Sequence, residues 1–108
     1  MFVVENYTLK MDKAMSFEIP KMYREFIEKR PDLFRELKSW SIYQHSLGTW
    51  GGVMEVSEYD CFEDYQRWLK SFIVDKDFAP ILTAYYDCVV SGSLKEVIMD
   101  KLGSWTRG

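Results

Sequence analysis

The stretch SWSIYQHSLGTWGGVMEVSE, residues 39–58, decides the fold, because it reads as two strands joined by a glycine-rich turn. β-Branched and aromatic residues alternate with polar ones over residues 39–47 and 52–58, and this pattern predicts a β-hairpin. With the turn centred on Leu47-Gly48, His45 would pair with Trp50, and Tyr43 with Gly52. The two faces of the hairpin would then hold Ser41, Tyr43, His45, Trp50 and Met54 on one side, and Trp40, Ile42, Gln44, Val53 and Glu55 on the other.

The hairpin is flanked on each side by one further strand and by helical sequence. Residues 1–10 predict a strand, and the apolar spacing over 15–29 predicts an amphipathic helix. Pro20 places the regular start of that helix near Ile19, and Pro31 ends it at about Arg30. After the hairpin, two apolar stripes predict a pair of helical segments, made by Phe62, Tyr65, Leu69, Phe72 and Ile73, and then by Phe78, Ile81, Leu82, Tyr85 and Val89. Residues 94–102 predict the last strand.

This order of elements predicts an α+β fold of the ferredoxin-like βαββαβ type. One four-stranded antiparallel sheet would carry the helices on a single face, with the first and third strands in the centre. Large apolar side chains occur on both faces of most strands, so the face without helices needs a cover. We therefore expect a homodimer that pairs the open sheet faces and forms a dimeric α/β barrel.

Composition limits the class of protein. The chain has 108 residues and suggests one domain over residues 1–102, with a short C-terminal tail over 103–108. A net charge of −3 argues against nucleic acid or an anionic membrane as partner, and the apolar runs are too short for a transmembrane helix. With no signal peptide pattern and two widely spaced cysteines, Cys61 and Cys88, we expect a cytoplasmic protein with free thiols.

Over residues 1–102 the chain resembles the dimeric α/β-barrel superfamily. The resemblance rests on the element order, on the hairpin turn over 47–52, and on the strand over 53–59 leading into the aromatic helix start over 60–65. It is greatest to small uncharacterised members and to the NIPSNAP-like and antibiotic-biosynthesis-monooxygenase-like branches. The resemblance implies the barrel dimer and a range of activities, including cofactor-free monooxygenases, haem-degrading enzymes and isomerases, so it does not fix the function.

The candidate catalytic residues are His45, Tyr43 and Glu55. His45 is the single histidine and would act as the acid or base, with Tyr43 and Glu55 as polar partners. The glutamates Glu5 and Glu96 also fall within strands, where burial would raise the pKa of a carboxyl and make it a base. The alternatives are a solvent-exposed His45, and glutamates that face outward, lie at an edge or form ion pairs across the dimer.

Aromatic and apolar side chains of the strands predict the ligand site, formed by Tyr7, Trp40, Trp50 and Met54. The alternative is that these side chains fill the dimer core. One histidine without clustered partners predicts no metal site, and the hairpin glycines are not followed by the helix that a phosphate loop needs, so we expect no cofactor. The sequence thus predicts a small-molecule-binding protein, a cofactor-free monooxygenase or isomerase for an aromatic or polyketide-like compound. The alternative is a non-enzymatic homodimeric binding or interaction module.

Overall fold

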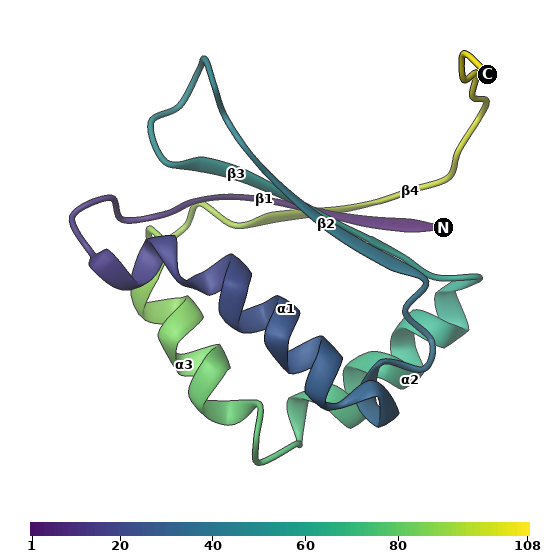
Figure 1. Cartoon of the computed structure of the whole chain (residues 1–108), viewed down its shortest axis with the longest axis horizontal. Helices are drawn as coiled ribbons and strands as arrows, with labels where there is room; N and C mark the ends of the chain where they lie inside the picture. The colour runs from purple at the N-terminus through teal and green to yellow at the C-terminus, as the bar shows by residue number, and fades with distance from the viewer.

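Four antiparallel strands form the sheet, and three helices cover one of its faces (Figure 1). The computed structural model describes all 108 residues. The strands are β1 (Phe2–Thr8), β2 (Ser39–Gln44), β3 (Gly52–Glu58) and β4 (Lys95–Met99). The helices are α1 (Ile19–Lys29), α2 (Phe62–Ile73) and α3 (Ala79–Cys88), with short 3-10 turns η1 (Ala14–Phe17) and η2 (Pro31–Phe34).

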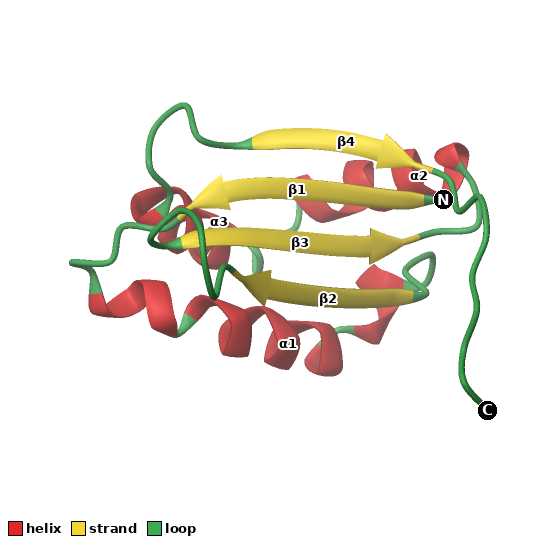
Figure 2. Cartoon of the chain, turned by 90° about the horizontal axis from the view of Figure 1, so that it is seen from above, coloured by secondary structure: helices red, strands yellow, loops and turns green.

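The strand order is β2-β3-β1-β4, as Figure 2 shows from above the sheet. β1 and β3 are therefore the central strands, and the ferredoxin-like α+β fold expected from the sequence is confirmed. The helical positions of the prolines are as expected too, since Pro20 lies in the first turn of α1 and Pro31 follows its end. None of the helices combines the length and the apolar character that a membrane crossing requires.

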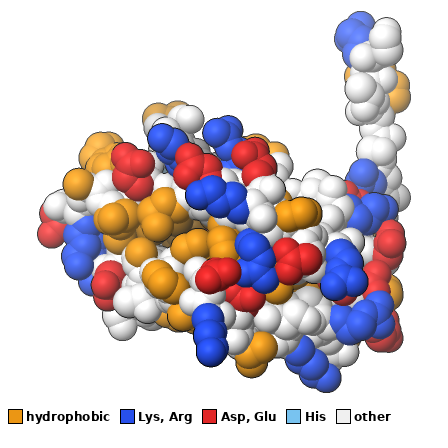
Figure 3. Space-filling model, turned by 60° about the horizontal axis from the view of Figure 1, so that its bottom comes forward, with side chains coloured by type: hydrophobic (Ala, Val, Ile, Leu, Met, Phe, Trp, Pro, Cys, Tyr) orange, Lys and Arg blue, Asp and Glu red, His pale blue; other side chains and the backbone are white.

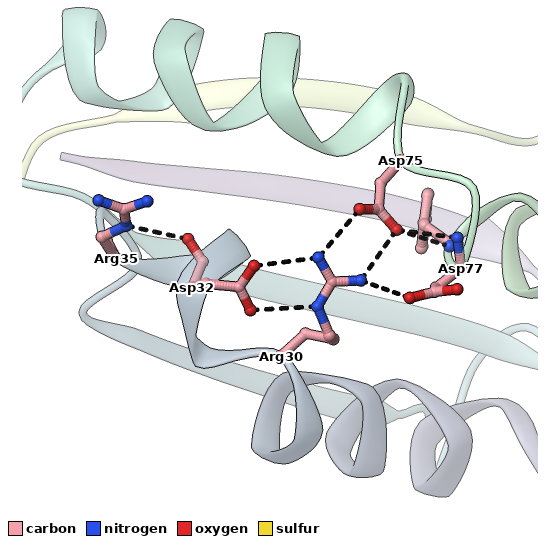
Figure 4. Close-up of polar contacts among 6 residues, drawn as sticks. Arg30, Asp32, Arg35, Asp75 and Asp77 are labelled. Carbon is pink, nitrogen blue, oxygen red and sulfur yellow. Dashed lines mark hydrogen bonds and ion pairs between the residues drawn. The ribbon is translucent and has the colours of Figure 1, made fainter.

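An arginine cluster fixes the end of α1 beside the loop between α2 and α3 (Figure 4). The guanidinium of Arg30 donates to Asp32, to Asp75 at 3.1 Å and to Asp77 at 2.6 Å. Asp75 also accepts the backbone N–H groups of Asp77 and Phe78, which begins the turn into α3. The break between the two helical segments is thus an ordered corner, held by charge-assisted hydrogen bonds.

Aromatic side chains fill most of the core between the sheet and the helices. The larger core cluster consists of Val3, Phe26, Phe34, Tyr59, Tyr65, Trp68, Phe72 and Phe78. The predicted stripe on α2 is wrong in part, because Leu69 is 36% exposed and Ile73 is 58% exposed, whereas Trp68 is buried. Tyr65, Trp68 and Phe72 lie three and four residues apart and form the buried stripe of this helix instead.

The hairpin register differs from the predicted one by two residues. Tyr43 pairs with Met54 and not with Gly52, and β2 ends at Gln44, so the loop before β3 is longer than a tight turn. The backbone N–H of His45 still donates to the carbonyl of Gly52 at 2.9 Å. A shift of two residues keeps every strand residue on its predicted face, because side chains alternate with a period of two.

Candidate functional site

Three glutamates stand side by side across the three strands β3, β1 and β4. Glu5 in β1 pairs directly with Glu55 in β3 and with Glu96 in β4. We call Glu55, Glu5 and Glu96 the glutamate row. Like charges at directly paired positions repel each other, so the row needs a physical reason to persist.

The glutamate row points toward the helices. Val3 and Tyr7, two residues before and after Glu5, belong to the two buried core clusters on that side, and alternate side chains of a strand share a face. Glu5 and Glu55 are half-buried there, whereas Glu96 is exposed because β4 is an edge strand. The row therefore runs from the interior to the rim of the helical layer.

Glu55 and Glu96 are held by hydrogen bonds, and Glu5 is not. The hydroxyl of Tyr7 and the indole Nε1–H of Trp40 each donate to Glu55 at 2.7 Å. The hydroxyl of Tyr65, on α2, donates to Glu96 at 3.2 Å. The carboxyl of Glu5 makes no hydrogen bond or ion pair, so it is the free member of the row.

Burial sets the protonation of this site. It raises the pKa of Glu5 to about 7, and the neighbouring charges of Glu55 and Glu96 add to the effect. Burial also raises the pKa of Glu55, although the hydrogen bonds from Trp40 and Tyr7 act in the opposite direction. Since burial raises the pKa of Tyr7 as well, its hydroxyl keeps its proton and remains a donor. Glu5 therefore changes its charge near neutral pH.

A pocket of about 240 Å³ lies between the glutamate row and the three helices. Its walls are mainly aromatic and aliphatic, and its only charged lining residues are the three glutamates. Apolar side chains gather in a hollow on the helical side of the molecule, with charged side chains around it (Figure 3). Leu69 of α2 and Ile81 and Leu82 of α3 line this space from the helical side.

Two polar groups on the pocket wall have no hydrogen-bond partner. They are the indole Nε1–H of Trp68, a residue only 8% exposed, and the hydroxyl of Tyr85. A buried donor without a partner costs free energy, and a ligand with an acceptor atom would remove that cost. The pocket thus combines mainly apolar walls with a carboxyl that can exchange a proton, an arrangement that suits a flat apolar compound.

The predicted site residues fall into two groups that lie apart. Tyr7, Trp40 and Glu55 meet in the hydrogen-bonded cluster of the interior pocket. Tyr43, His45 and Trp50 line a second hollow of about 480 Å³, formed by the hairpin loop, Pro20 and the residues after β1. Met54 belongs to neither hollow and pairs with Tyr43 on the open sheet face.

The predicted residues that line the second hollow are exposed. The side chain of Trp50 is 80% exposed, and His45 is exposed as well. The imidazole of His45 lies against the backbone of Gly52, where the absence of a side chain leaves room for it. His45, Tyr43 and Trp50 line this one hollow, and Glu55 does not.

Sequence reasoning missed the helical part of the interior pocket. Tyr23, Trp68 and Tyr85 line it from α1, α2 and α3. The apolar spacing along each helix places these residues on the side that faces the sheet, and this spacing is the signal in the sequence that could have located them. Whether helices close on a sheet or leave a pocket depends on how far apart they lie, and the stripes do not encode that distance.

Solved structures show the same fold. No protein-family model and no curated protein sequence matches the chain. An uncharacterised NIPSNAP domain protein from Burkholderia xenovorans has a TM-score of 0.70 at 13% identity, covering 98% of this chain and 100% of its own. SnoaB, a cofactor-independent oxygenase from Streptomyces nogalater, has a TM-score of 0.65 at 11% identity, covering 95% and 96%.

A dimeric protein of unknown function and ferredoxin-like fold from Bacteroides fragilis is similar as well, with a TM-score of 0.57 at 14% identity, covering 91% of this chain and 94% of its own. The expected resemblance to NIPSNAP-like and oxygenase structures is thus confirmed for the fold. Structures of this fold include dimers and an oxygenase, and they also include proteins without a known function.

Proposed function

We propose that this protein binds an aromatic or polyketide-like compound in the interior pocket and removes a proton from it. The observation that carries the proposal is Glu5, a half-buried carboxyl that makes no hydrogen bond and lies in a pocket with mainly aromatic and aliphatic walls. With a pKa of about 7, Glu5 is about half ionised at neutral pH, which suits a general base. Glu55, fixed by Tyr7 and Trp40, would hold the geometry of the row and keep Glu5 a strong base by its charge.

Proton removal would begin a cofactor-free oxygenation or an isomerisation. In the oxygenation, Glu5 takes a proton from an activated CH₂ group and the resulting carbanion gives its electrons to dioxygen. One oxygen atom becomes the new carbonyl and the other leaves as water with both hydrogens. In the isomerisation, Glu5 returns the proton to a different carbon. The indole N–H of Trp68 and the hydroxyl of Tyr85 would stabilise the enolate oxygen in both reactions.

The homodimer through the open sheet face belongs to the same proposal. Phe2, Val4, Val56, Val97 and Met99 make that face apolar, and the last two are nearly half exposed. The similar structure from B. fragilis is described as dimeric, which supports a partner copy as the cover. The two cysteines are free, Cys61 exposed and Cys88 buried, as expected, and this supports the cytoplasmic location proposed from the sequence.

A second candidate places the chemistry at His45. The hollow beside it has about twice the volume of the interior pocket, and Tyr43 and Trp50 offer an aromatic wall. We favour the interior pocket because its base is shielded from water and its donors lack partners, whereas His45 is exposed. The non-enzymatic dimer stays the alternative if neither site turns over a substrate.

Anthrone, a flat tricyclic ketone with an acidic CH₂ group, is a suitable probe. We expect the wild type to consume oxygen and form anthraquinone above the rate without protein, faster as pH rises through about 7 and Glu5 ionises. Glu5→Gln should reduce this rate roughly 100-fold or more, the usual size of a lost general base. The exposed Glu25→Gln on α1 is the matched control and should keep the rate.

His45→Ala distinguishes the two sites. Retained turnover in His45→Ala supports the interior pocket, while loss in His45→Ala with turnover retained in Glu5→Gln would move the chemistry to the second hollow. Absence of both turnover and anthrone binding in the wild type would favour the non-enzymatic module.

A further inference from the structure

The charge of the interior pocket is not balanced by the protein. Glu5, Glu55 and Glu96 line it, and no lysine, arginine or histidine does. The ion pairs of the chain involve other carboxylates, and none includes a member of the glutamate row. Paired buried carboxylates normally lie near a cation, because leaving the charge uncompensated in an apolar site is costly.

The walls of the pocket are of a kind that attracts organic cations. Tyr23, Trp40, Tyr65, Trp68 and Tyr85 line it together with two phenylalanines. The faces of such rings carry negative charge density and attract ammonium groups, most strongly at tryptophan. Trp68 and Phe72 stack with ring centroids 4.3 Å apart, so part of this wall is fixed in orientation.

The unpartnered Trp68 is an independent sign of a bound molecule. Its side chain is more than nine-tenths buried on the pocket wall, yet the indole N–H donates to nothing. A ligand that places a hydrogen-bond acceptor beside Trp68 would give this N–H a partner. No group of three His, Cys, Asp or Glu side chains is arranged to hold a metal ion, so the geometry suits a larger organic cation.

We infer that the interior pocket selects aromatic compounds that carry a positively charged nitrogen and an oxygen acceptor. The ammonium would lie against the glutamate row, the ring between the aromatic walls, and the acceptor at the indole N–H of Trp68. This inference rests on the proposed function, since it names the class of compound that the same pocket takes.

Binding of a cation should be linked to the proton on Glu5. The titratable groups around Glu5 are Glu55 from β3, Glu96 from β4 and five tyrosine hydroxyls that keep their protons. The tyrosines are Tyr7 from β1, Tyr23 from α1, Tyr65 from α2, Tyr85 from α3 and Tyr59 after β3. Burial raises the pKa of Glu5 to about 7, so this carboxyl changes its charge near neutral pH. A cation favours the ionised carboxylate, so it should bind more tightly as pH rises and should release a proton when Glu5 starts protonated.

The test compares two compounds of the same shape in calorimetric titrations of the full chain. The cation is meta-methoxyphenyltrimethylammonium, and its neutral counterpart is meta-tert-butylanisole, in which carbon replaces the charged nitrogen. Neither compound titrates, so any pH dependence belongs to the protein. We expect the cation to bind at least about tenfold more tightly near pH 8, and several-fold more tightly there than near pH 6.

Glu5→Gln should remove the pH dependence and most of the preference for the cation, while the surface variant Glu25→Gln should change neither. Equal affinity for both compounds would overturn the inference and leave the proposed pocket intact. Binding of neither compound, together with no binding of anthrone, would overturn the pocket as well. A cation preference that is undiminished in Glu5→Gln would place the cation elsewhere and overturn the inference.

Discussion

Two neighbouring rows of the same sheet contrast with each other. The glutamate row faces the helices. The adjacent row, formed by Val56, Val4 and Val97, faces away from them. The covered side of the sheet thus carries charge at its centre, and the uncovered side carries valines. In a sheet with one solvated face the expected arrangement is the reverse.

This contrast teaches that neither face is complete in the single chain. Valines stay on an open face at little cost only if something covers them, and in the proposed dimer a second copy would do so by symmetry. Carboxyls stay beneath helices only if they are protonated, hydrogen-bonded or paired with a bound group. The proposed dimer would cover the open face, and the proposed ligand would balance the charge of the covered face.

The largest expected effect is on assembly. Val56→Glu puts a charge in the middle of the open face, where a partner copy would have to bury it, so the dimer should be lost. Sedimentation at micromolar concentration should give twice the chain mass for the wild type and the mass of one chain for the variant. Val74→Glu, at a residue that is 76% exposed after α2, is the control and should stay dimeric. A wild type that sediments as a monomer would contradict both the dimer and the barrel.

The next largest effect is on stability, and it should differ between a residue packed in the core and a residue at the edge of the interior pocket. Phe26 is 7% exposed and contacts Phe34 and Phe78, so Phe26→Ala should lower the free energy of unfolding by about 3–5 kcal/mol. Leu69→Ala should lower it by less than about 1 kcal/mol, because Leu69 lies at the pocket and is partly exposed. Urea unfolding of the two variants measures this difference. Equal losses would mean that the helices close over the pocket.

A smaller effect concerns the charge of the glutamate row. The folded state raises the pKa of Glu5 from 4.5 to about 7, so it binds more protons than the unfolded state between these values. The stabilisation by protonated Glu5 is therefore present at low pH and is lost as pH rises from about 4.5 to 7, by about 3 kcal/mol in all.

Urea unfolding across this range should show that loss in the wild type and in Glu25→Gln, and a flatter profile in Glu5→Gln. A Glu5→Gln profile parallel to that of the wild type would show that Glu5 is well solvated and would weaken its role as a base.

Most of the fold could be predicted because it depends on local periodicity. The alternation over residues 39–58 predicts the hairpin, and Pro20 and Pro31 set the ends of α1 through backbone geometry alone. The predicted register was wrong by two residues because the loop between β2 and β3 is longer than a tight turn. This loop contacts the residues after β1, where the backbone N–H of Leu9 donates to the carbonyl of Gly51. The α2 stripe was wrong in part because Leu69 and Ile73 border a pocket and do not pack in the core.

The candidate site could be predicted only in pieces. Glu5, Glu55, Tyr7 and Trp40 were recognised as chemically informative, because charge and large aromatic rings within strands are unusual. Their grouping was not predicted, since it depends on the pairing of β1 with both β3 and β4, strands far apart in sequence.

The sequence by itself determined the element types, their order and which side chains share a strand face, because these follow from backbone preferences over a few residues. Only the tertiary structure decided which face the helices cover, that three glutamates become direct neighbours, and that Trp68 and Tyr85 complete a pocket with them. The reason is physical: a strand's alternation fixes two faces but does not say which is inside, and the burial that raises the pKa of Glu5 arises only when distant segments meet.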